Sequence, residues 1–136
     1  MVKLIMGLKG AGKTKQLIQD INTSVKNENG SMVCIEKGTK LRYDIDIRVR
    51  LIDYCDYAMD SLSALKGFCA GLLAGNFDIS HIFIDSFYKH VQNAGIAEVE
   101  DFLLWCEAFG KTHGISFTVV VSDDVANATD KIKAFL

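Results

Sequence analysis

The chain has 136 residues, of which 49% are hydrophobic and 24% are charged. This length and balance are typical of one globular domain with a sizeable core, and they exclude a disordered chain. The formal net charge of −2 gives no general basic surface for nucleic acid or for an anionic membrane, so we expect neither as a partner.

The first elements are a strand, a glycine-rich loop and a helix. Val2–Met6 is predicted to be a short buried strand, and Lys13 to about Lys26 an amphipathic helix, because four aliphatic residues recur on one helical stripe: Leu17, Ile18, Ile21 and Val25. The loop between them fits the phosphate-binding pattern of Gly, four residues, Gly-Lys-Ser/Thr. Its residues are Gly7, Leu8, Lys9, Gly10, Ala11, Gly12, Lys13 and Thr14.

This pattern has a chemical reason. Glycines let a loop turn several backbone N–H groups towards a phosphate without a Cβ in the way, and the start of the following helix adds its positive dipole end. We expect the Lys13 ammonium to contact the β- and γ-phosphates of a nucleotide, and the Thr14 hydroxyl to bind Mg²⁺.

A second strand is predicted over Ser31–Glu36, after a turn at Asn27–Gly30. In Asp44–Asp53 charged and aliphatic residues alternate, which indicates a half-exposed strand or a short hairpin, and we assign Arg50–Asp53 to the third strand of the sheet. The three arginines of this region, Arg42, Arg48 and Arg50, either pair with nearby aspartates or donate an arginine to the nucleotide of a neighbouring subunit.

Ser61–Asn76 is predicted to be a helix, and His81–Asp85 an apolar strand that ends in an aspartate. Downstream of a phosphate-binding loop, such an aspartate is expected to hold the Mg²⁺ shell through water, on the side away from Thr14. The alternative is that Asp85 caps the next turn.

The last elements are a helix from Glu98 to about His113, a fifth strand over Ile115–Val121 and a final helix over about Val125–Phe135. Ser122 and Asp123 follow the fifth strand, so they either face the γ-phosphate or cap the last helix. Trp105 lies off the apolar stripe of its helix and either fills a groove or contacts a second copy of the chain.

The cysteines and the N-terminal region indicate the cellular compartment in which the protein is expected. Cys34, Cys55, Cys69 and Cys106 are widely spaced and form no Cys-x-x-Cys pair, which argues against a zinc site and favours reduced cysteines, three of them in the core. A strand and a glycine-rich loop at the start leave no room for a signal peptide, and the most apolar stretch is too short to span a bilayer. We therefore expect a cytoplasmic protein.

Alternating strands and helices with this loop at the first turn predict a single-domain, doubly wound parallel sheet of about five strands in a three-layer α/β/α arrangement. On Gly7–Thr14 and Ile82–Asp85 the chain resembles the P-loop NTPase superfamily. The order of its elements, including Arg42-Tyr43, is similar to that of the thymidine kinase family. That family has a Glu where this chain has Ser86, and a zinc-binding insert for which this chain has no cysteine pairs.

The function expected from these residues is binding of ATP with Mg²⁺, through the loop and Asp85, with slow hydrolysis. Ser86 cannot act as the base that activates water, which leaves Glu36 or Asp123, so the expected catalytic residues are Lys13, Asp85 and Glu36. GTP is the less favoured nucleotide because no Asn-Lys-x-Asp motif is present.

Two alternatives stay open at this point. One is a nucleotide-regulated module that binds a partner protein or a second copy of the chain without significant turnover. The other is phosphoryl transfer to a small metabolite or nucleoside, with an acceptor pocket formed by Asp53, Tyr54, Asp56 and Tyr57.

Overall fold

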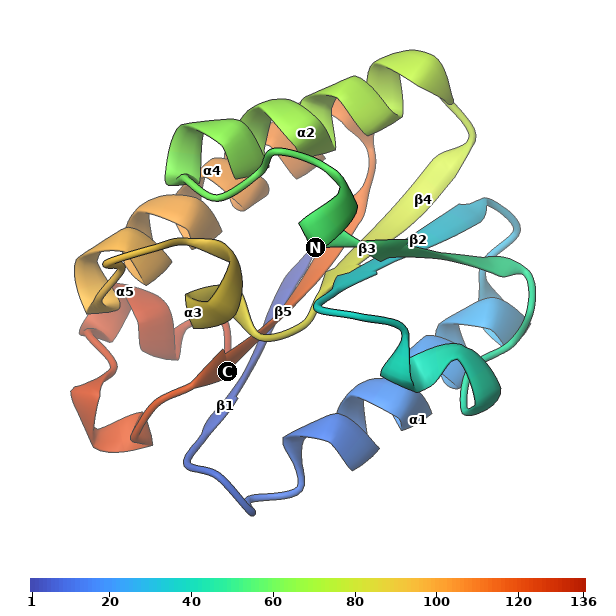
Figure 1. Ribbon diagram of the computed structural model, residues 1–136. Coiled ribbons are helices and arrows are strands. Elements are labelled where there is room, and N and C mark those ends of the chain that lie inside the picture. Colours follow the sequence, from blue (N-terminus) through green and yellow to red (C-terminus); the bar gives the residue numbers. More distant parts are fainter.

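Five parallel strands form one sheet in the spatial order β1-β5-β4-β2-β3 (Figure 1). The computed structural model describes residues 1–136. The strands are β1 (Val2–Gly7), β2 (Ser31–Glu36), β3 (Val49–Asp53), β4 (Ile79–Ile84) and β5 (Ser116–Ser122). The predicted parallel α/β fold with five strands is confirmed.

Helices cover both faces of the sheet. They are α1 (Lys13–Asn27), α2 (Leu62–Gly75), α3 (Phe87–His90), α4 (Ile96–His113) and α5 (Asp130–Lys133), with 3₁₀ turns η1 (Lys40–Tyr43), η2 (Tyr54–Asp56) and η3 (Val125–Asn127). Figure 1 shows α1 on one side of the sheet, and α2 and α4 on the other. None of these helices combines the length and the apolar character needed to cross a bilayer.

Each face of the sheet has its own apolar cluster. Under α1, the buried side chains Leu17, Ile21 and Val25 pack with Phe83 and other strand residues. Under α2 and α4, a larger cluster includes the buried side chains of Leu65, Cys69, Phe102, Leu103 and Cys106. The spacing of three to four residues within each helix explains this, because it places those side chains on the face towards the sheet. The result is the predicted three-layer arrangement.

The connections after β1 and β5 leave the sheet on opposite faces. β1 leads into α1, whose residues belong to one apolar cluster, whereas β5 leads into η3 and α5, whose Ile132 belongs to the other. These two strands are neighbours, with Gly7 paired with Ser122 at their carboxyl ends. Where adjacent connections diverge in a parallel sheet, a crevice opens beyond the carboxyl ends of the strands, and ligands bind there.

The alternating segment before β3 differs from its prediction. Arg50–Asp53 does lie in β3, as predicted, but Asp44–Arg48 forms turns rather than a strand or hairpin. The reason is local side-chain bonding to the backbone, which competes with a β ladder. The Asp46 carboxylate accepts from the backbone N–H of Arg48 at 2.9 Å, and its own N–H donates to the Asn22 side chain at 3.1 Å.

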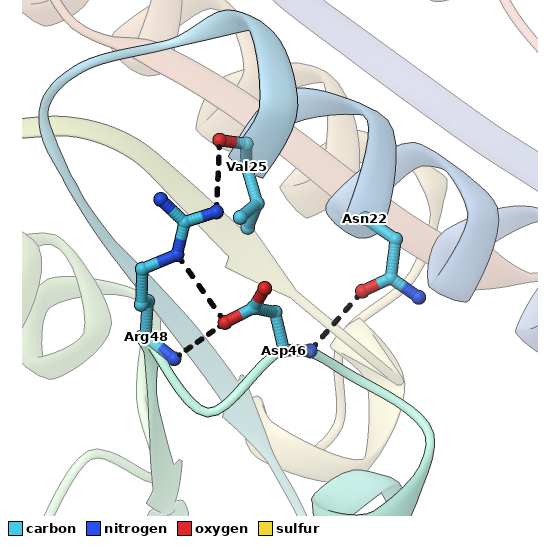
Figure 2. A network of polar contacts seen from close by, with 4 residues as sticks. All are labelled: Asn22, Val25, Asp46 and Arg48. Atoms are coloured by element: carbon cyan, nitrogen blue, oxygen red, sulfur yellow. Dashed lines mark hydrogen bonds and ion pairs between the residues drawn. The ribbon is translucent and has the colours of Figure 1, made fainter.

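These contacts hold the turns against α1, as Figure 2 shows. The Arg48 guanidinium pairs with Asp46 at 3.4 Å and donates to the backbone carbonyl of Val25 at 3.3 Å, near the end of α1. Asn22 and Val25 both belong to α1. The segment between β2 and β3 is therefore tied to the helix that follows the glycine-rich loop.

The predicted final helix is also different, since it is split into η3 and α5. Ala128 between them has extended backbone, and the Thr129 hydroxyl accepts from the N–H of Ile132 at 3.2 Å, which starts a new helix.

Trp105 packs within the chain, with the centre of its ring 4.7 Å from that of the Phe109 ring. The predicted core cysteines are confirmed, with Cys55 the exposed one.

His81 gives the fold a dependence on pH. It lies on β4, 9% exposed, with Nδ1 3.0 Å from Glu28 Oε2 and Nε2 2.8 Å from Thr118 Oγ1. Burial lowers its pKa, and the contact with Glu28 opposes this shift only in part. A histidine with a lowered pKa binds protons more readily in the unfolded chain, whose pKa is about 6.5, so the free energy of unfolding falls as pH drops below that value.

We predict that His81→Gln loses less free energy of unfolding between pH 7 and pH 5 than the wild type does, because the variant has no imidazole to protonate at this position. Urea denaturation at both pH values measures the difference. Equal losses in the two proteins would contradict the lowered pKa.

Candidate functional site

The glycine-rich loop between β1 and α1 has the backbone that its sequence requires. Gly10 and Gly12 have φ values of +87° and +83°, in the left-handed region that residues with a Cβ rarely adopt. A Cβ at either position would meet nothing within 4 Å, so the space beside the loop is open to a ligand. Glycine is needed at position 7 for a different reason, close packing, since a Cβ there would lie 2.9 Å from the Cβ of Ala11.

Contacts across the loop keep it compact. The Lys13 ammonium donates to the Leu8 carbonyl at 2.9 Å, and the N–H of Ala11 donates to the same oxygen at 3.1 Å. The Gly7 carbonyl accepts from the N–H of Asp123 at 3.1 Å, which joins the loop to the end of β5. The Lys13 side chain thus folds back over the loop, and a ligand oxygen could replace the Leu8 carbonyl oxygen as the acceptor of its hydrogen bond.

The loop forms one wall of a cleft of about 650 Å³ at the carboxyl ends of β1, β5 and β4. We call it the lysine cleft. Its lining residues are Lys9, Gly10, Gly12, Lys13, Thr14, Lys15, Asp85, Ser86, Lys89, Val120 and Ser122. Four of them are lysines and one is an acid, whereas the whole chain has a net charge of −2. Such a concentration of one sign attracts anions.

Asp85 is the single carboxylate of the lysine cleft. It follows β4, and its backbone N–H donates to Ile35 of the neighbouring strand at 2.9 Å. Burial raises its pKa, whereas hydrogen bonds from Ser86 and the charges of Lys89 and Lys40 act in the opposite direction. The predicted metal-side residues Thr14 and Asp85 therefore lie in the same cleft, one from α1 and one from the end of β4.

Glu36 and Asp85 follow paired residues of neighbouring strands, Ile35 of β2 and Ile84 of β4, but Glu36 does not line the lysine cleft. Its side chain is 1% exposed and accepts from the N–H of Leu41 at 3.2 Å, which anchors η1. Burial raises its pKa, and the charge of Asp85 adds to that shift. The structure thus gives Glu36 a contact with the backbone, and its role as a base stays a prediction.

At the carboxyl end of β5, its last residue Ser122 lines the lysine cleft and the following residue Asp123 does not. Asp123 accepts from the Tyr88 hydroxyl at 2.6 Å and from the Asn127 amide at 2.9 Å. These bonds, that of Tyr88 first, lower the pKa of Asp123. Ser122 alone faces the space for a ligand, whereas Asp123 fixes neighbouring side chains.

Sequence reasoning missed the single turn of α3, which begins at Phe87, two residues after Asp85. Ser86 has φ 59° and ψ 57°, a left-handed conformation in a residue other than glycine. His90 is fully buried, and its Nε2 lies 2.5 Å from the Asp85 carbonyl oxygen, so this nitrogen carries the hydrogen and donates. Burial lowers the pKa of His90 to about 4, which keeps the ring neutral at pH 7. Four residues are too few for a helical pattern to reveal.

The predicted acceptor pocket is separate from the lysine cleft. Tyr54, Asp56 and Tyr57 line a hollow of about 260 Å³ that shares no lining residue with the cleft. Asp53, the fourth predicted residue, does not line this hollow. Its carboxylate accepts from the backbone N–H groups of Gly38 at 2.9 Å and Cys55 at 3.0 Å.

The arginines before and in β3 do not reach the lysine cleft either. Arg48 pairs with Asp46, whereas Arg42 donates to the Thr39 hydroxyl at 3.2 Å and lies 5.8 Å from the ring centre of Tyr43. None of the three arginines of this region lines the cleft, whose cations are all lysines.

No protein-family model and no curated protein matches this chain.

We predict that Ser86→Gly is more stable than Ser86→Ala by about 0.5–1 kcal/mol, because glycine enters the left-handed region without the steric cost that a Cβ brings. Both variants remove the hydroxyl, so their difference isolates the backbone effect. Urea denaturation measures it, and an alanine variant at least as stable as the glycine variant would contradict the left-handed turn.

Proposed function

We propose that the protein binds ATP with Mg²⁺ in the lysine cleft and hydrolyses it slowly. The observation that carries this proposal is the convergence of four lysines and two left-handed glycines on one open cleft whose single carboxylate is Asp85. A polyphosphate is the ligand that such a site suits, because lysines and free backbone N–H groups complement its charge. A volume of about 650 Å³ lies within the range of small-molecule sites.

Each residue has a role in this proposal. The loop residues Gly7 to Thr14 surround the β- and γ-phosphates, and Lys13 exchanges its bond to the Leu8 carbonyl for one to a phosphate oxygen. Thr14, through its hydroxyl, and Asp85, through water, would hold Mg²⁺, which neutralises charge on the phosphate oxygens when bound. No group of three or more acidic, histidine or cysteine side chains converges to hold a metal, which suits an ion bound mainly by phosphate and water.

Slow turnover follows from the shortage of bases. Asp85 is the only carboxylate of the lysine cleft, and the other candidates, Glu36 and Asp123, accept hydrogen bonds from Leu41 and Tyr88.

The shortage of a free base also favours a second candidate function, a nucleotide-regulated module that binds a partner protein or a second copy of the chain. Phosphoryl transfer to a small metabolite has less support, because the hollow lined by Tyr54, Asp56 and Tyr57 shares no residue with the cleft.

We predict that the wild type binds Mg²⁺-ATP with a Kd in the micromolar range and that Lys13→Ala weakens this binding at least ~10-fold, because a hydrogen bond to a charged group contributes about 1.5–3 kcal/mol. Isothermal titration calorimetry with ATP and with a non-hydrolysable analogue measures both. Lys111→Ala is the matched control, since it removes an exposed lysine of α4 that does not line the cleft. A wild type that binds neither nucleotide would refute the proposal.

We further predict that removing Mg²⁺ with a chelator weakens ATP binding to the wild type more than to Asp85→Asn, because the variant lacks the carboxylate charge that would help to hold the ion. Calorimetric titration with and without the chelator measures both effects, and equal weakening in the two proteins would contradict the role of Asp85.

Turnover is tested by measuring phosphate release with Mg²⁺ present. Loss of a slow wild-type rate in Glu36→Gln, with ATP binding unchanged, would assign Glu36 as the base, and an unchanged rate would leave it a structural residue.

A further inference from the structure

We propose that Lys89 is a second phosphate-binding residue of the lysine cleft and contacts the terminal phosphoryl group of the nucleotide from the wall opposite Lys13. This inference rests on the function proposed above and adds a residue that the glycine-rich pattern does not contain. Its basis is the position of Lys89, the rigidity of the turn that carries it and the lack of a partner for its charge.

Lys89 and Lys13 reach the cleft from different layers of the molecule. Lys13 is the first residue of α1, whose apolar face packs in one cluster, whereas the α3 residue Phe87 is buried in the cluster on the other face of the sheet. Both lysines nevertheless line the same cleft. A polyphosphate bound along the loop therefore lies between two cations supplied by the two sides of the sheet.

The neighbourhood of Asp85 indicates which phosphate Lys89 contacts. Lys89 and Asp85 both line the lysine cleft, and only Ser86 separates Asp85 from the turn α3 that carries Lys89. In the function proposed above, Asp85 would hold Mg²⁺ through water, and the ion would neutralise charge on the terminal phosphate oxygens. Lys89 consequently lies beside the terminal phosphate, on the side of the cleft opposite the glycine-rich loop, which surrounds the β- and γ-phosphates.

The other side chains of α3 fix this turn to the protein. Phe87 is fully buried, the Tyr88 hydroxyl donates to Asp123 at 2.6 Å, and His90 donates to the Asp85 carbonyl at 2.5 Å. Lys89 is the one exposed side chain of the four, and its backbone N–H donates to the Ser86 carbonyl at 2.8 Å. A cation carried by a fixed turn loses less conformational entropy on binding than one carried by a mobile loop.

The ammonium of Lys89 has no hydrogen bond or ion pair within the chain, in contrast to Lys3, which pairs with Asp20 at 2.7 Å, and Lys66, which pairs with Asp101 at 3.0 Å. It is therefore available to a ligand oxygen. A cation placed on the terminal phosphoryl group within the same chain does what an arginine finger does, so no arginine from a neighbouring subunit is needed.

The test is calorimetric titration of ATP and ADP, each with Mg²⁺, into the wild type, Lys89→Ala, Lys89→Arg, Lys13→Ala and the control Lys111→Ala. We expect Lys89→Ala to bind ATP ~10-fold more weakly and ADP within about twofold of the wild type, because only ATP has the terminal phosphate that a charged donor contacts. Lys89→Arg restores most of the preference for ATP, and Lys13→Ala weakens both nucleotides.

Each other outcome has a separate meaning. If the wild type binds both nucleotides and Lys89→Ala keeps the wild-type ratio of the two affinities, the role of Lys89 is refuted while the proposed function stands. If the wild type binds neither, both proposals fail together. A thermal melt of Lys89→Ala that matches the wild type shows that any loss of ATP binding comes from the missing ammonium and not from the fold.

Discussion

Parallel pairing of the strands is the constraint on which the rest of this structure depends. It brings the carboxyl ends of all five strands to one edge of the sheet, so the residues that end the strands become neighbours in space. In spatial order, four of the strands end at Gly7, Ser122, Glu36 and Asp53, and Asp85 directly follows β4, which lies between the strands of Ser122 and Glu36. The glycine-rich loop and its lysines lie at one end of this edge, and two carboxylates lie at the other.

The carboxylates at this edge differ in what they bind within the chain. Glu36 and Asp53 accept hydrogen bonds from backbone N–H groups of the loops that follow β2, and Asp123 accepts from Tyr88 and Asn127. Such bonds offset the cost of keeping a carboxylate near or within the protein interior. Asp85, half-buried beside Ser86, is the one that faces the lysines. The positive charge of the cleft therefore stays largely uncancelled, although the chain as a whole is slightly acidic.

Two features of the turn after Asp85 lower the stability of the fold. Ser86 adopts a left-handed backbone, and the buried Nδ1 of His90 has no hydrogen-bond partner. Either feature costs stability, and such costs persist where the surrounding packing holds the geometry, often at functional sites. Here the buried ring of Phe87 and the bonds of Tyr88 and His90 hold α3 in place. The same contacts fix the turn that places Lys89 in the wall of the lysine cleft, so the strained backbone of Ser86 and the candidate site lie together.

The sequence by itself determined the class of fold and the centre of the candidate site. Apolar runs, helical stripes and the glycine pattern are local signals, so the strands, the major helices, the loop with Lys13 and Thr14, and Asp85 at the end of a strand were all predictable. Only the tertiary structure decided which strand lies beside which. The insertion of β5 between β1 and β4 brings Ser122 to the cleft, and the packing of α3 brings Lys89 there. The tertiary structure also decided that Asp44–Arg48 forms turns and not a strand, because Asp46 bonds to Arg48 within the turn and to Asn22 of α1. It likewise decided that the Glu36 carboxylate accepts from the N–H of Leu41. The periodicity of the sequence encodes neither kind of bond.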